Sequence, residues 1–256
     1  MKIVFFVSTT DDENILEFKK NNPQLKNIIF INQLIKKDFS NFKEHPNVIT
    51  FREKGLSKSR NRGIMQSDAD IIVLTDNDIV FVENSEQLIC ETFNSNPKID
   101  IATFKIMTPQ KKSYKNYKSR EFKHNIFSIM KVSSAEIVIK RKSIEGIKYD
   151  ERFGLGTDLP SGEENIFLSL CLARNLQIRF FPKTLCYHEM ESSGKNLSNI
   201  PTSRAKGYIF KAIFGGLYFL PCFYFAIKKY PIYKKQFSLI NYLKILLFDE
   251  VNHTTK

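Results

Sequence analysis

Short apolar runs alternate with amphipathic stretches along most of the chain, and this alternation restricts the fold more than any other feature. The apolar runs predict strands at 2–7, 28–32, 47–51, 70–76, 99–106, 135–141 and 177–182. The amphipathic stretches predict helices at 12–20, 57–66, 85–95 and 162–175. Strands that alternate with helices favour a mostly parallel sheet with helices packed on its faces. The sequence therefore predicts an α/β fold, and 256 residues are enough for one sizeable domain, alone or with an appendage.

Basic residues are concentrated at the end of the chain. Residues 201–256 hold 9 Lys and Arg against 2 Asp and Glu, whereas residues 1–200 hold 30 against 25. Such asymmetry points to an anionic partner for the tail, either a membrane surface or a nucleic acid. The uncharged run at 212–227 is shorter than the about 20 residues that a membrane-spanning helix needs.

Two segments follow this run, a basic one at 228–235 and an amphipathic one at 238–248. Lysines beside an apolar, aromatic face suit an anchor that lies in the interface of an anionic membrane. The alternative is that these helices pack on the first domain or on a second subunit.

The cysteines give no sign of a disulfide framework or a zinc site. Cys90, Cys171, Cys186 and Cys222 are scattered without a C-x-x-C pair, which fits a reducing compartment. The apolar run at 3–7 is too short for the core of a signal peptide, so we expect it to be a buried strand.

Two carboxylates, Asp76 and Asp78, follow the strand predicted at 70–76. Ligands bind beyond the carboxyl ends of strands in open parallel sheets, and residues i and i+2 of an extended segment face the same way. The pair can therefore converge on one Mg²⁺ or Mn²⁺ ion. The alternative is an Asx-turn at one Asp and solvation of the other. The equally spaced Asp68 and Asp70 lie at the amino end of the strand, which indicates turn chemistry.

Two acids, Glu163 and Glu164, begin the helix predicted at 162–175. Ser161 and Glu164 have the spacing of a capping box, and acids suit the first turn of any helix. The functional alternative is a general base that takes a proton from an attacking hydroxyl.

Three further features have open roles. His188 follows the last predicted strand and is either structural or a third metal ligand beside the Asp-x-Asp pair. The stretch 54–63 places Lys54, Lys58, Arg60 and Arg62 at a helix start, where they are either solvated or bind an anion such as a diphosphate. The basic, aromatic segment 111–123 is either a solvated connector or a lid that contacts an anion.

Four segments in this order carry a family resemblance. They are GLSKSRNRGI at 55–64, LTDND at 74–78, YDERFGLGTDLPSGEENIF at 149–167 and YHE at 187–189. The chain, over about residues 1–190, resembles family 2-type glycosyltransferases, which are inverting, nucleotide-sugar-dependent enzymes of surface polysaccharide synthesis. The resemblance implies a GT-A fold, with a donor-binding half at 1–108, an acceptor-binding half at 109–200 and a helical tail at 201–256.

The resemblance also implies roles for individual residues. Asp76 and Asp78 match the Asp-x-Asp motif that binds Mn²⁺ or Mg²⁺ and the donor diphosphate, and His188 matches a histidine that completes the metal shell. The second acid of the Gly-Glu-Glu at 162–164 matches the base, which favours Glu164 over Glu163. The implied donor-site residues are Thr9, Arg60, Asn61, Asp76, Asn77 and Asp78. The strand ends at 8–10 and 32–33 depart from the family pattern, so the nucleotide stays open.

The expected function is therefore metal-dependent, inverting transfer of a sugar from a nucleoside-diphosphate sugar to a hydroxyl of a polysaccharide or lipid-linked acceptor. We expect the chain on the cytoplasmic face of the cell membrane, as a possible homo-oligomer and without a nucleic-acid partner. One alternative is a nucleotidyltransferase acting on sugar phosphates, which needs a Gly-rich basic signature where the chain has STTDDE at 8–13. Another is a basic nucleic-acid-binding protein, which the apolar runs of the tail disfavour.

Overall fold

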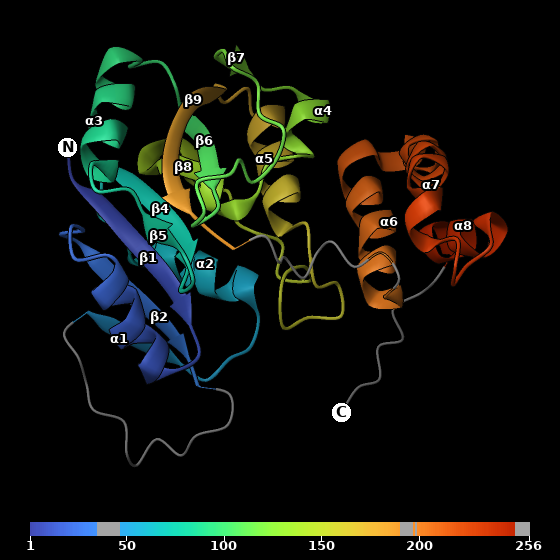
Figure 1. The fold of residues 1–256 in the computed structure, drawn as a ribbon, viewed down its shortest axis with the longest axis horizontal. Coiled ribbons are helices and arrows are strands. Elements are labelled where there is room, and N and C mark those ends of the chain that lie inside the picture. Colours follow the sequence, from blue (N-terminus) through green and yellow to red (C-terminus); the bar gives the residue numbers. More distant parts are fainter. Residues whose placement is uncertain (35–46, 190–196, 198, 249–256) are drawn as a thin grey trace.

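The computed structural model contains a nine-stranded sheet with helices on both faces (Figure 1). It describes residues 1–34, 47–189, 197 and 199–248. The strands are β1 Ile3–Thr9, β2 Ile28–Gln33, β3 Val48–Phe51, β4 Ile71–Asp76, β5 Val80–Phe81, β6 Ile101–Met107, β7 Phe122–Lys123, β8 Ile137–Lys140 and β9 Ile178–Tyr187. The α-helices are α1 Asp12–Asn21, α2 Leu56–Gln66, α3 Ser85–Ser95, α4 Ile126–Ile129, α5 Glu163–Ala173, α6 Ile200–Phe214, α7 Phe219–Tyr233 and α8 Leu239–Phe248.

The sheet is mixed but dominated by one strand direction. Its order is β3-β2-β1-β4-β8-β6-β9-β5, with β7 paired to β9. Strands β1 to β4, β6 and β9 run the same way, and β5, β7 and β8 run against them. The predicted α/β class with a mostly parallel sheet is therefore confirmed. The carboxyl ends of the six co-directional strands meet at one edge, where ligands bind in such sheets.

Strand β1 is buried on both faces, which explains its unbroken apolar sequence. Ile3, Phe5 and Val7 pack into one core with residues of α1 and α3. Val4 and Phe6 point to the opposite face and pack with residues of α2 and α5. The two helix layers therefore bury the sheet from both sides, and each large apolar side chain contributes about 1.5–3 kcal/mol.

The C-terminal helices α6, α7 and α8 form a separate layer beside α5 (Figure 1). Tyr233 and Tyr242 stack in their core with ring centroids 3.6 Å apart. Helix α6 also packs on the sheet domain. A Cβ added at Gly162 would lie only 2.0 Å from Cδ1 of Ile209 on α6. Among the described helices, none combines the length and the apolar character needed to cross a membrane.

Candidate active site

Arg60 connects three elements at the carboxyl edge of the sheet. It lies on α2, is 2% exposed, and donates from Nη1 to Glu163 Oε1 at 2.6 Å and from Nη2 to Asp76 Oδ1 at 3.3 Å. Its guanidinium also lies 5.5 Å from the centroid of the Tyr149 ring. Burial alone would lower the pKa of Arg60, but the two carboxylates outweigh it and raise that pKa. The buried cation therefore ties α2, the end of β4 and the start of α5 into one unit.

The two acids of the Asp-x-Asp motif lie in different surroundings. Burial raises the pKa of Asp76, although Arg60 opposes this shift. Asp78 is exposed, and its Oδ2 lies 3.3 Å from Nε2 of His188. The hydrogen bond from His188 lowers the pKa of Asp78. Asp76 therefore faces the buried arginine, whereas Asp78 faces solvent and the histidine.

His188 is held in place by three contacts. Its backbone N–H donates to the carbonyl of Met107 at 2.9 Å, and the ring of Tyr114 meets its imidazole edge-on at 5.4 Å. The hydrogen bond to Asp78 raises the pKa of His188. Nδ1 of the imidazole is buried and has no hydrogen-bond partner in the described chain.

The predicted three-ligand set of Asp76, Asp78 and His188 is not assembled as one group. Within residues 1–34, 47–189, 197 and 199–248, no three His, Cys, Asp or Glu side chains lie together as a metal site. Asp78 and His188 form an adjacent oxygen and nitrogen pair. Mn²⁺ accepts both ligand types, and Mn²⁺ and Mg²⁺ commonly complete their shells with water and substrate phosphates. The residues present therefore fit a divalent cation that takes some of its ligands from Asp78 and His188 and the others from a bound diphosphate.

The start of α5 separates the two candidate bases. The N-cap is Gly162, whose φ of 89° is left-handed, and no side chain caps the helix. Ser161 Oγ is buried without a partner in the described chain, so the capping-box interpretation is wrong. Arg60 engages Glu163, which is 5% exposed. Glu164 is half-buried and makes no side-chain hydrogen bond to another described residue.

Glu164 has the electrostatics of a general base. Burial, together with the neighbouring Glu163 carboxylate, raises its pKa to about 8. Lys206, on α6, interacts electrostatically with both glutamates, and burial lowers its own pKa. A carboxylate with a pKa near neutrality is well matched to proton transfer from a hydroxyl. No sequence pattern points to Lys206, because only tertiary packing brings α6 to this site.

Three other predicted donor-site residues have local structural contacts or lie in a turn. Thr9 Oγ1 donates to the carbonyl of Asp11 at 3.1 Å. Asn61 is 4% exposed, and its amide exchanges hydrogen bonds with the backbone of Tyr149. Asn77 is half-buried in the turn after β4.

The basic residues of the stretch 54–63 point to different parts of the structure. Arg62 pairs with Glu53 at 3.0 Å, and Lys54 and Lys58 line a cleft on the side of α6. Only Arg60 of that stretch reaches the Asp-x-Asp motif.

The segment 111–123 is docked rather than a solvated connector. Tyr117 OH donates to Glu136 Oε1 at 3.1 Å and accepts from the backbone N–H of Ile106 at 3.1 Å. Lys115 pairs with the same glutamate, and Tyr114 is 7% exposed against His188. Its three aromatic residues, Tyr114, Tyr117 and Phe122, were the available sequence signal for this docking.

Comparison with known proteins agrees with this architecture. Residues 31–150 match the family model of glycosyl transferase family 2. The Staphylococcus aureus protein TarS 1-349 superposes with a TM-score of 0.61 at 13% identity, over 92% of this chain and 74% of that one. A mannosyltransferase from Pyrobaculum calidifontis, in complex with GDP-Man and Mn²⁺, gives 0.56 at 13% identity, over 84% of this chain and 65% of that one. Another TarS structure contains UDP-GlcNAc, with a TM-score of 0.57 at 12% identity, over 92% of this chain and 74% of that one.

The search of curated proteins found none similar in sequence to this chain. The family match and the fold nevertheless agree with the resemblance seen in the sequence: residues 31–150 match glycosyl transferase family 2, and the chain has the GT-A fold of the glycosyltransferases on which it superposes.

Proposed function

We propose that this enzyme transfers a sugar, with inversion, from a nucleoside-diphosphate sugar to an acceptor hydroxyl, and that it depends on a divalent metal. The observation that carries the proposal is Glu164, a half-buried carboxylate at the start of α5 that interacts electrostatically with Arg60 and the adjacent Glu163, with its pKa raised to about 8. The complexes of the structural neighbours with UDP-GlcNAc and with GDP-Man and Mn²⁺ support a nucleotide-sugar donor. They do not favour one nucleotide over the other here.

The mechanism follows from the positions of the side chains. Asp78 and His188 would hold Mn²⁺ or Mg²⁺, which supplies positive charge for the leaving diphosphate. Glu164 takes the proton of the acceptor hydroxyl as its oxygen bonds to the sugar carbon. The bond from that carbon to the diphosphate breaks, and the nucleoside diphosphate leaves. Arg60 holds Asp76 and Glu163 in place, so the site stays assembled during this single displacement.

We assign residues 1–108 to donor binding, 109–200 to acceptor binding and 201–256 to attachment. The acceptor would be a polysaccharide or a lipid-linked glycan. Turnover of Glu164→Gln tests the base directly, because the amide keeps the shape of the side chain but takes no proton. We expect a fall of about 10²–10⁴-fold.

Glu163→Gln is the matched control for that test. It removes the charge that faces Arg60, so we expect lower stability and, in the protein that remains folded, a smaller loss of turnover. Unchanged turnover in Glu164→Gln, measured as release of nucleoside diphosphate in the presence of acceptor, would refute the assignment.

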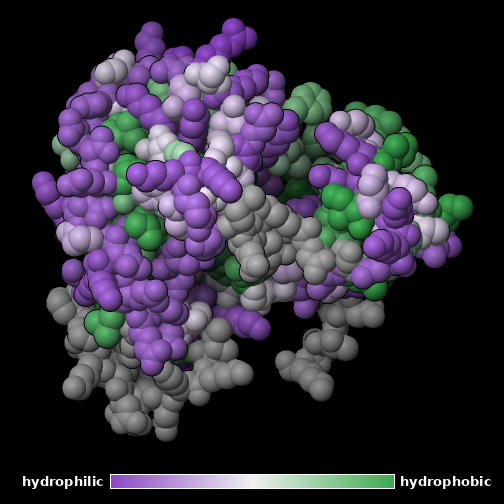
Figure 2. Space-filling model, viewed as in Figure 1, coloured by the Kyte–Doolittle hydropathy of each residue, from purple (hydrophilic) through white to green (hydrophobic). Residues whose placement is uncertain are grey.

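We further propose that the tail attaches the enzyme to an anionic membrane, on the cytoplasmic face. Leu220, Phe223 and Ile227 of α7 are 55%, 46% and 64% exposed, and Lys228 and Lys229 follow them. Apolar surface gathers over these C-terminal helices at the right of Figure 2, whereas the sheet domain is mostly hydrophilic in that view. An exposed apolar face beside lysines suits the interface of an anionic bilayer.

Vesicle flotation tests this attachment. The full chain should float with phosphatidylglycerol vesicles, and the triple variant Leu220→Ser, Phe223→Ser, Ile227→Ser should not. Leu16→Ser changes an equally exposed leucine on α1 and should float like the parent. If the triple variant floats unchanged but loses dimer mass in solution, the face binds a second subunit instead.

A further inference from the structure

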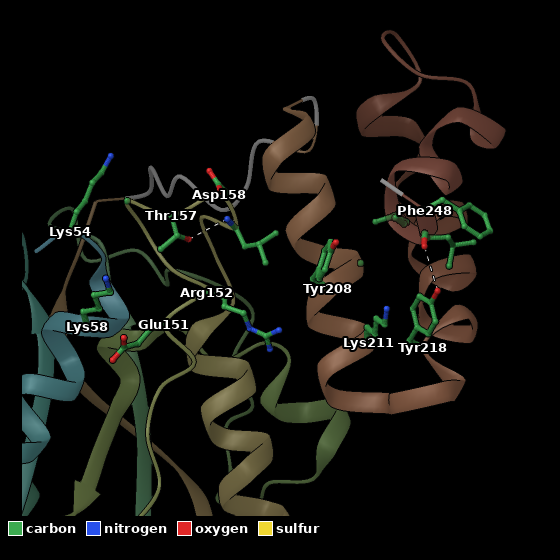
Figure 3. A pocket seen from close by; sticks show the side chains of 15 residues that line it. Lys54, Lys58, Glu151, Arg152, Thr157, Asp158, Tyr208, Lys211, Tyr218 and Phe248 are labelled. Carbon is green, nitrogen blue, oxygen red and sulfur yellow. Dashed lines mark hydrogen bonds between the residues drawn. The ribbon is translucent and has the colours of Figure 1, made fainter. Parts of the chain in front are cut away.

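A cleft of about 690 Å³ lies between the sheet domain and the C-terminal helices (Figure 3). One wall comes from Lys54 and Lys58 at the start of α2 and from the loop at 151–159, and the other from α6, the start of α7 and the end of α8. This volume is typical of sites that bind small molecules. Arg60, Asp76 and Glu163 are not among the residues that line the cleft.

The domain wall of the cleft is basic. Lys54 and Lys58 have no ion-pair partner among the described residues, and Arg152 extends from its loop toward α6 (Figure 3). Lys211 adds a fourth cation from the facing helix. Glu151 and Asp158 also line the cleft. Asn61 donates to the Glu151 carboxylate at 3.0 Å, and the paired Asp150 holds Arg152 at 2.6 Å.

The helix wall is aromatic and aliphatic. Tyr218 OH donates to the carbonyl of Leu247 at 3.4 Å, and this bond joins the start of α7 to the end of α8. The ammonium of Lys211 lies 5.8 Å from the centroid of the Tyr218 ring. Phe248 is 74% exposed, so the apolar wall continues to the molecular surface. The cleft is thus cationic on one side and apolar on the other.

The cleft adjoins the candidate base. Gly154 belongs to the loop that forms the domain wall, and a Cβ there would lie 3.4 Å from Cδ of Glu163. Gly207 and Tyr208 of the helix wall follow Lys206, whose charge acts on Glu164. A molecule in this cleft would therefore lie next to the helix start that carries Glu164.

We propose that this cleft binds the acceptor, and that the acceptor is an amphiphile in which a phosphate or diphosphate is joined to an apolar chain. The phosphate oxygens meet Lys54, Lys58 and Lys211, and the chain lies on the wall of Tyr218 and Phe248. The acceptor site of the 109–200 half, which contributes the loop at 151–159, therefore extends to residues on both sides of that half. This inference rests on the proposed function and narrows its acceptor to a phosphate-linked lipid. Charge complementarity selects the anion, since ammonium groups bind phosphate as point charges, and the apolar wall selects the chain. A soluble polyanion would leave that wall exposed to water.

A single fluorescent reporter can test this inference, because the chain contains no tryptophan. Phe248→Trp places one at the exposed end of the cleft. We expect dodecyl phosphate, kept below its micelle concentration, to change the emission saturably at concentrations at least about tenfold below those of inorganic phosphate or dodecyl maltoside. In this background Lys58→Gln and Lys211→Gln should each weaken binding about tenfold. Lys98→Gln, an exposed lysine far from the cleft, should not.

Several outcomes would overturn the inference. Equal responses to dodecyl phosphate and dodecyl maltoside would mean a merely apolar surface, and equal responses to inorganic phosphate would mean a merely basic one. An emission change with phosphatidylglycerol vesicles that Lys58→Gln and Lys211→Gln leave unchanged, where dodecyl phosphate gives no change, would mean a general lipid contact. Stabilisation of the same proteins by a nucleoside diphosphate with Mn²⁺ tests the proposed function separately from the acceptor inference. If that signal is present and dodecyl phosphate does not bind, the acceptor inference alone fails; if the signal is missing, the proposed function fails.

Discussion

The two ends of strand β4 carry the same Asp-x-Asp spacing in opposite surroundings. At the amino end, Asp68 lies 2.6 Å from Lys2 Nζ with both side chains exposed, and Asp70 accepts the backbone N–H of Lys2 at 2.7 Å. At the carboxyl end, Asp76 contacts the buried Arg60, and Asp78 contacts His188. The amino-end pair fixes a strand start, as its position in the sequence predicted.

The difference between the two ends comes from strand polarity and not from the local sequence. Exposed ion pairs contribute about 0–1 kcal/mol because water and salt screen them. A buried ion pair becomes costly when one partner is removed, because the other charge stays desolvated. The carboxyl-end pair is therefore the place where a substitution changes both stability and chemistry, and the amino-end pair is its internal control.

The largest expected effect comes from removing the buried cation of the carboxyl end. Arg60→Met leaves the half-buried Asp76 and the buried Glu163 without their partner, so we expect a loss of about 3–5 kcal/mol in the free energy of unfolding. Lys2→Met removes the cation at the amino end, where water screens the exposed pair, and should change the free energy of unfolding far less. Urea denaturation of both variants measures this contrast, and equal losses would contradict it.

The next effect concerns turnover. Asp78→Asn keeps the size of the side chain but removes the charge that faces His188, so we expect sugar transfer to fall about 10²–10³-fold. Asp68→Asn is the matched change at the amino end, with an expected change of about twofold or less. Similar rates in the two variants would place the chemistry elsewhere.

A smaller effect is expected in the pH dependence of turnover. With its pKa at about 8, Glu164 is mostly protonated at neutral pH, and the base form grows as pH rises. We therefore expect kcat/KM to increase up to about tenfold per unit below pH 8 and then to level. A profile that stays flat from pH 6 to 9 in the parent enzyme would argue against Glu164 as base.

The same shift makes a prediction for stability. The pKa of Glu164 in the folded chain lies above its ordinary value of 4.5, so its stabilising contribution is present at low pH and is lost as pH rises toward 8. Glu164→Gln removes this loss, so the variant should be more stable than the parent at pH 9 by about 1 kcal/mol or more. Thermal melts at pH 5 and pH 9 compare the two proteins. A Glu164→Gln variant that is less stable than the parent at pH 9 would show that the ionised Glu164 carboxylate does not destabilise the folded chain.

The sequence predicted the longer strands and helices of the first 182 residues because their apolar periodicity is strong, but not the four-residue helix α4. It also predicted which residues lie at the carboxyl edge, since each of these motifs stands directly at the end of a predicted strand or the start of a predicted helix. The two-residue strands β5 and β7 are too short to leave a pattern. Strand β9 continues past Pro182 to Tyr187, with an irregular register opposite Lys105, and therefore brings His188 directly to the strand end.

Other features of the site depend on contacts that no local pattern encodes. Ser161 and Glu164 have the spacing of a capping box, but Gly162 takes the cap position in a left-handed conformation beneath Ile209. Arg60 of α2 contacts Asp76 and not Asp78, so Asp78 is the aspartate that faces solvent. The approach of Lys206 to Glu164 likewise requires α6 to pack on α5.

Calorimetric titration with UDP and GDP, with and without Mn²⁺, tests the central claim most directly. At least one nucleotide should bind the parent chain in a metal-dependent way, Asp68→Asn should bind it equally, and Asp78→Asn should bind it at least about tenfold more weakly. Binding that needs no metal, or that Asp68→Asn and Asp78→Asn share unchanged, would contradict the assignment of the donor site to the carboxyl end of β4.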